Sequence, residues 1–97
     1  MRAPHDDRSS RRAAALRQIV LGLADLPSDD VNNVVDLIEA GELPLALETL
    51  CTQIHEYDVD LRREERDGLG ILGGELGVSV AYLLGDPWAT KGGDECG

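Results

Sequence analysis

Aromatic residues are nearly missing from this chain of 97 residues. They make up 3% of the sequence and phenylalanine does not occur, whereas hydrophobic residues as a whole reach 42%. A core must therefore be built from Leu, Val, Ile and Ala, a composition that favours helices over a β-sandwich, which depends on aromatic and β-branched side chains. We expect an all-α protein, a compact single-domain bundle of four to five short helices.

Cysteines and long apolar segments are also scarce. Cys51 and Cys96 do not form the framework of a disulfide-stapled protein, and unbridged thiols fit a reducing cytoplasm. No apolar run approaches the roughly 18–20 residues that cross a membrane. His5 and His55 lie far apart, whereas a metal site needs clustered ligands. We therefore expect a cytoplasmic protein with no membrane contact, metal or cofactor, in which Cys51 is a buried small hydrophobe.

Basic residues are missing from the middle of the chain. The net charge is −10, from 19 acidic and 9 basic residues. Arginines are concentrated up to Arg17, but every charged residue from Asp25 to Asp60 is acidic. Such a surface repels nucleic acid and anionic lipid and attracts a basic partner. Acidic charge can also do no more than keep a small protein soluble.

One helical domain is predicted between two flexible ends. We expect residues 1–8 to form a disordered leader, residues 9–88 the helical domain, and residues 89–97 a flexible tail. The first helix is expected to be capped by Ser9 or Ser10 and to end near Ala24, before a Pro27 break. Its apolar stripe has helical spacing: Leu16, Ile19, Val20 and Leu23.

The next two helices are predicted to form a hairpin. Ser28 is expected to cap the second helix, and Gly41 to supply the left-handed residue that ends it. Pro44 suits the first turn of the third helix, and the short connection implies antiparallel packing. Two apolar faces are expected to meet: Val31, Val34, Val35 and Ile38 on one helix, and Leu43, Ala46, Leu47, Leu50, Cys51 and Ile54 on the other.

A fourth helix from Arg62 to Leu76 and a short fifth helix capped by Ser79 complete the prediction. Glycines within the fourth helix lower its intrinsic stability, and we attribute them to close helix packing at two pairs, Gly70 with Gly74 and Gly73 with Gly77. Trp88 is expected to follow the last helix and to be able to fold back onto the core.

Three possible motifs are weak. Gly68-Leu-Gly70-Ile-Leu-Gly73 matches the dinucleotide-binding spacing, but a charged helical segment precedes it instead of a strand. The segment from Leu76 to Gly85 is similar to the closing helix of Xre-type helix-turn-helix repressors, but no recognition helix is visible upstream. His55 lacks the partners of a nucleophilic site, so a structural role is favoured and no enzyme activity is expected.

The segment Glu56-Tyr57-Asp58 differs from these. It combines a rigid aromatic side chain with flanking carboxylates at a helix end, and Asp60 follows closely. Such a composition is typical of an interaction hot spot, although Tyr57 could equally pack over the helix end.

The middle of the chain resembles the MafI-like immunity proteins of bacterial toxin–immunity systems. The resemblance runs from about Asp30 to Leu61 and includes Ala40-Gly41-Glu42, Leu45-Ala46-Leu47-Glu48 and Glu56-Tyr57-Asp58. Asp60 stands where many members have proline.

The resemblance implies a protein that binds and neutralises a cognate toxin domain. Toxin domains in such systems are often nucleases with basic clefts, which an acidic helical surface would occupy or flank. The residues expected to make the contact are Asp36, Glu39, Glu42, Glu48, Glu56, Tyr57, Asp58 and Asp60. Two alternatives stay open, a small helix-turn-helix-like DNA-binding regulator and a helical docking subunit with another partner.

Overall fold

The computed structural model describes residues 7–85, and these residues form five helices and no strand. The helices are α1 (Asp7–Leu21), α2 (Ser28–Glu39), α3 (Leu43–Glu56), α4 (Arg63–Leu76) and α5 (Val80–Leu83). The predicted all-α bundle is therefore confirmed.

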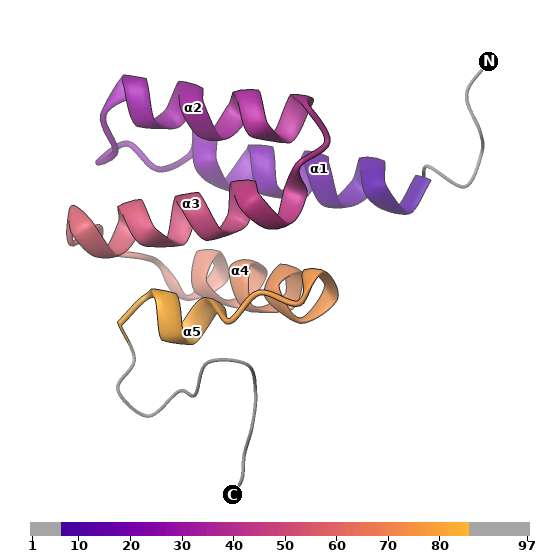
Figure 1. Cartoon of the computed structure of the whole chain (residues 1–97). Coiled ribbons are helices and arrows are strands. Elements are labelled where there is room, and N and C mark those ends of the chain that lie inside the picture. The colour runs from indigo at the N-terminus through magenta and orange to yellow at the C-terminus, as the bar shows by residue number, and fades with distance from the viewer. Residues whose placement is uncertain (1–6, 86–97) are drawn as a thin grey trace, which may run out of the picture.

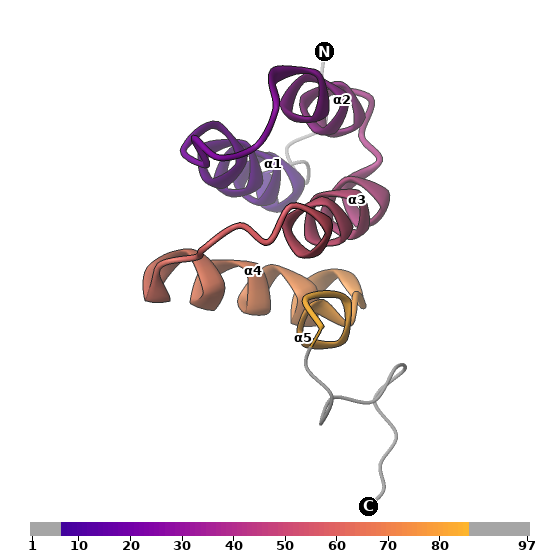
Figure 2. The ribbon, with the colours of Figure 1, turned by 90° about the vertical axis from the view of Figure 1, so that its left-hand side faces the viewer.

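Helix α3 lies at the centre of the bundle. It contacts each of the other four helices, whereas α2 contacts only α1 and α3 (Figure 1). The view in Figure 2 shows α1 and α2 on one side of α3, and α4 and α5 on the other side. A central position requires a helix with a wide apolar face, and the predicted stripe of α3 meets this requirement because all of its members are buried: Leu43, Ala46, Leu47, Leu50, Cys51 and Ile54.

The predicted hairpin of α2 and α3 is confirmed, as is the way in which α2 ends. Gly41 has a φ of +82°. Its N–H donates to the carbonyl oxygen of Ile38 at 3.0 Å, and the N–H of Glu42 donates to that of Leu37 at 2.9 Å. These two bonds form a Schellman motif. Pro44 lies in the first turn of α3, as predicted.

The start and end of the first helix differ from the prediction, and so does the cap of the second. Helix α1 begins at Asp7, before Ser9 and Ser10, and ends at Leu21 instead of Ala24. Pro27, with extended backbone angles, is the N-cap of α2, and Ser28 is its first helical residue. The serine prediction was wrong because the fixed φ of proline suits a residue that leads into a helix, which leaves the serine inside the first turn.

Close packing of the four predicted glycines is confirmed at Gly73 and wrong at the other three. A Cβ atom at Gly73 would lie 2.5 Å from Cγ2 of Val80 and 2.7 Å from the carbonyl oxygen of Val78. Gly70, Gly74 and Gly77 instead face open space. Gly73 thus lets α5 fold back onto α4, and Gly77, with a φ of +74°, reverses the chain between them.

Other predictions concern the ends of the chain. Helix α5 is a single turn with Ser79 at the N-cap position, but the serine side chain does not make a capping bond. Residues 1–6 of the predicted leader, Trp88 and the predicted tail with Cys96 lie outside the described residues.

Candidate protein-docking surface

The end of α3 is held by a second Schellman motif with an unusual residue in the left-handed position. Asp58 has a φ of 54°, and its N–H donates to the carbonyl oxygen of His55 at 3.2 Å. The N–H of Val59 donates to that of Ile54 at 3.0 Å. Aspartate tolerates this backbone region better than most residues. Asp58 therefore has a backbone role besides the docking role predicted for it.

Antiparallel packing brings the first turn of α2 beside the last turn of α3. Gln53 donates from its Nε2 to Oδ1 of Asp30 at 3.2 Å. A side-chain hydrogen bond with Asp30, the negative charge of Asp30, slight desolvation and the charge of Glu56 raise the pKa of Tyr57. Asp29, which is exposed, precedes the partly buried Asp30 in the same turn. We call Asp29, Asp30, Glu56, Tyr57 and Asp58 the acidic end of the hairpin.

The sequence prediction missed the two residues that α2 contributes to the acidic end. Asp29 and Asp30 lie in the first turn of α2, where carboxylates favour the helix dipole, and neither was among the predicted contact residues. Their proximity to Tyr57 follows from the antiparallel direction of the hairpin. That direction was itself predicted, so pairing the start of α2 with the end of α3 would have found them.

The eight predicted contact residues are all exposed, but they do not form one cluster. Glu56, Tyr57 and Asp58 lie at the acidic end, with Asp60 shortly after them in the chain. Glu42 lies at the opposite end of the hairpin, about 20 Å from Glu56 along α3, whereas Asp36 and Glu39 lie roughly 9 and 14 Å from Asp30 along α2. Glu48 lies between the two groups on the outer face of α3.

An arginine side chain lies close to the hairpin at the end opposite the acidic end. Nη1 of Arg17 on α1 lies 3.5 Å from Oε2 of Glu39. The described arginine side chains all belong to α1, α4 or the residue before α4: Arg11, Arg12, Arg17, Arg62, Arg63 and Arg66. Arg12 and Arg62 pair with Glu75 and Glu65. Among the described ion pairs, none neutralises a carboxylate of the acidic end.

Tyr57 is the exposed apolar group of this surface. Its side chain is 49% exposed. An aromatic ring surrounded by carboxylates offers apolar contact area together with negative charge, and it loses little conformational freedom on binding. The alternative that Tyr57 packs over the helix end stays a prediction.

The surroundings of Cys51 and His55 indicate a packing role for both side chains. Cys51 is fully buried, as predicted, and burial raises the pKa of its thiol to about 12. His55 lies against Gly85, where a Cβ atom would come within 2.7 Å of the imidazole Cε1. Within residues 7–85, no three His, Cys, Asp or Glu side chains form a group that could hold a metal ion.

The structure gives little support to the helix-turn-helix interpretation. Helix α5, which carries the repressor-like segment, has four residues and therefore spans about 6 Å. The helix before it, α4, has Glu64 and Glu65 among its arginines, so it does not present a continuous basic face.

Comparisons with protein-family models, curated proteins and solved structures found no match to this chain. The resemblance to the MafI-like immunity proteins therefore rests on the residues quoted for it. None of the described helices is long and apolar enough to cross a membrane.

Proposed function

We propose that this protein is an immunity protein that binds and neutralises a cognate bacterial toxin domain, a basic nuclease, through the acidic surface of its α2–α3 hairpin. The observation that carries the proposal is the half-exposed Tyr57 among the carboxylates of Asp30, Glu56 and Asp58, with no described cation paired to them. The resemblance of the hairpin to the MafI-like immunity proteins supports the same function.

Negative charge at the acidic end would act before contact. The carboxylates attract a basic nucleic-acid-binding cleft and raise the association rate, an effect that weakens as salt screens the charges. Tyr57 would then enter the cleft as the apolar anchor. In this mechanism, the hairpin occupies the place of the nucleic acid backbone, and the toxin cannot bind its substrate.

The hairpin is suited to this task because its acidic end is ordered before binding. The Schellman motif fixes Asp58, and Asp30 contacts both Gln53 and Tyr57. A preorganised surface loses less conformational entropy on association than a flexible one. The buried stripe of α3 supports this surface from below.

The direct test is co-expression with the C-terminal domain encoded by the adjacent gene. Rescue of growth and co-purification of the two proteins are expected. A protein that is co-purified without rescuing growth would indicate a docking subunit. Binding to duplex DNA in a shift assay across salt concentrations, without binding to the toxin domain, would instead support the DNA-binding regulator.

The contact surface is tested by replacing Glu56 with lysine. Glu56→Lys reverses a charge at the acidic end, and a cation in the last turn of α3 also favours the helix dipole, so the fold should persist. We expect association with the toxin domain to slow about tenfold at low salt and to depend less on salt.

Asp67→Lys is the matched control, because Asp67 is exposed on α4 and outside the hairpin. Asp58 is unsuited to charge reversal, since lysine would also strain the left-handed backbone there. An association rate that responds equally to Glu56→Lys and Asp67→Lys would show that only net charge matters and would contradict docking through the acidic end.

A further inference from the structure

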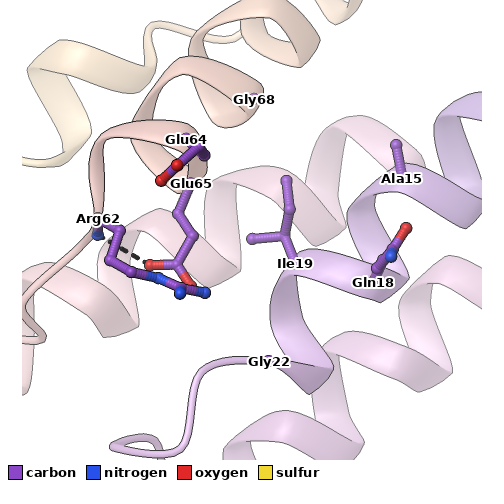
Figure 3. A pocket seen from close by; sticks show the side chains of 8 residues that line it. All are labelled: Ala15, Gln18, Ile19, Gly22, Arg62, Glu64, Glu65 and Gly68. Atoms are coloured by element: carbon purple, nitrogen blue, oxygen red, sulfur yellow. Dashed lines mark hydrogen bonds and ion pairs between the residues drawn. The ribbon is translucent and has the colours of Figure 1, made fainter.

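A groove between α1 and α4 opens on the side of the molecule away from α3. Figure 2 shows α1 and α4 reaching this side, with α3 on the other. Two adjoining hollows of about 380 and 310 Å³ share Ala15, Ile19 and Gly68. Figure 3 shows the first of them. Ile71, which lines the second hollow, is 64% exposed, more than any other large hydrophobic residue that the structure describes. Within residues 7–85, this largely apolar groove is left open.

Helix α1 presents one regular row of side chains to this groove. Arg11, Ala15 and Gln18 of α1, and Gly22 one residue beyond its end, line the groove at intervals of four, three and four residues. This spacing follows one face of a helix, as at the seam of a helical bundle. Small residues at Ala15 and Gly22 leave hollows in the row.

Helix α4 presents a row with the same spacing. Glu64, Gly68, Ile71 and Glu75 line the groove at intervals of four, three and four residues. This row is acidic at both ends, whereas the row on α1 carries Arg11 and has Arg12 beside it, and Nε of Arg12 lies 2.8 Å from Oε1 of Glu75 across the groove. The two sides of the groove therefore differ in charge.

The two rows run in opposite directions. One hollow combines Arg11 with Ile71 and Glu75, and the other combines Gln18 and Gly22 with Glu64. The start of α1 thus lies beside the end of α4.

We propose that this groove is the contact surface of a homodimer, in which α1 of each copy packs on α4 of the other around a two-fold axis along the groove. Rotation about such an axis keeps the position along the groove and exchanges its two sides. Arg11 then faces Glu75 of the second copy, and Ile71 faces Ala15 of the second copy. Gln18 likewise lies over Gly68. Ile71 and Gln18 each meet a small residue, and the basic side meets the acidic side.

Electrostatic repulsion disfavours the other possible orientation of the two-fold axis. A two-fold axis across the groove would place α4 on α4 and bring Glu64 of one copy opposite Glu75 of the other. Like charges facing each other at an interface are strongly unfavourable. Packing α1 on α4 avoids this repulsion and forms two equivalent Arg11–Glu75 contacts.

The expected dimer is weak. Helices of 14 and 15 residues are each about 20 Å long, so the face that they form lies at the small end of the range seen for protein interfaces. Association should therefore depend on concentration. It does not use the acidic end of the hairpin, which stays free for another partner.

Analytical ultracentrifugation of the full chain over a range of concentrations tests the dimer. We expect reversible dimerisation that becomes at least about tenfold weaker in Arg11→Glu and in Glu75→Arg, because each change opposes like charges. The double variant should recover part of the affinity, because it restores the Arg11–Glu75 contact with the charges exchanged, while the loss of the pair between Arg12 and Glu75 within each chain persists. Arg66→Glu, on α4 but outside the groove, should leave the affinity unchanged.

The apolar contact is tested by Ile71→Ser, with Leu21→Ser as its control. Both side chains are exposed, at 64% and 59%, but Leu21 does not line the groove. Ile71→Ser should weaken the dimer about tenfold, and Leu21→Ser should not. A chain that stays monomeric at about 1 mM would overturn the proposal and leave the groove to a different protein. A dimer that the double charge reversal does not restore would also overturn it.

Discussion

Tyr57 makes a contact with Asp30 that depends on the protonation of its phenol. The neutral phenol donates a hydrogen bond to the carboxylate, and the negative charges of Asp30 and Glu56 oppose its ionisation, so the pKa of Tyr57 is raised. The folded protein then holds this proton more tightly than the unfolded chain. The contribution to the free energy of unfolding is complete below the ordinary tyrosine pKa of about 10 and is lost as pH rises through the folded-state value.

Replacing Asp30 with asparagine should lower the pKa of Tyr57 toward its ordinary value, because both the acceptor and its charge are weakened. The measurement is an ultraviolet titration of phenolate absorption in a Tyr82→Phe background, which leaves Tyr57 as the only tyrosine. Asp36→Asn, which removes a carboxylate farther along α2, is the control. Equal titration curves for the two variants would show that Asp30 does not contact the phenol.

Cys51 is expected to be unreactive while the protein is folded. Burial raises the pKa of its thiol to about 12, so almost no thiolate exists at pH 8, and the sulfur is also inaccessible. In a Cys96→Ser background, labelling by a disulfide reagent should be slow under native conditions and rapid in denaturant. Fast labelling under native conditions would mean that the core around α3 opens readily.

At the scale of helices, one glycine of α4 determines how α5 docks. Gly73→Ala would place a methyl group against Val80 and the backbone of Val78, and the free energy of unfolding should fall by roughly 1–3 kcal/mol. Gly70→Ala, in the same helix but facing open space, should raise it by up to about 1 kcal/mol through helix propensity. Denaturant unfolding measures both changes, and a stabilising Gly73→Ala would contradict the close packing.

Helix α3 is the part of the predicted hairpin that packs against the rest of the bundle. Its predicted apolar stripe is fully confirmed. The prediction succeeded because the signals on which it rested, a glycine, a proline and a regular apolar period, all act within a few residues. The start of α2 was predicted less well. Ser28 and Pro27 are both suited to a helix start, and only the backbone angles of Pro27 in the structure distinguish the cap from the first helical residue.

The whole molecule carries a net charge of −10, and its carboxylates repel one another most where arginine is absent. Glu48→Gln should raise the free energy of unfolding by roughly 0.3 kcal/mol at low salt, since Glu48 has no described ion pair and lies on the acidic hairpin. Glu39→Gln should not stabilise, because it removes the pair with Arg17. Thermal unfolding in low and moderate salt measures both variants, and the gain for Glu48→Gln should shrink as salt screens the repulsion.

The sequence alone was sufficient for the helical class, the hairpin and the absence of basic residues between Asp25 and Asp60. Those features depend on composition and on signals between neighbouring residues, such as Gly41 at a helix end. Only the tertiary structure placed Asp30 beside Tyr57, Arg17 beside Glu39, and the rows of α1 and α4 on either side of one groove. These contacts join residues far apart in the chain, and their geometry is set by how the helices pack around α3, which no local pattern specifies.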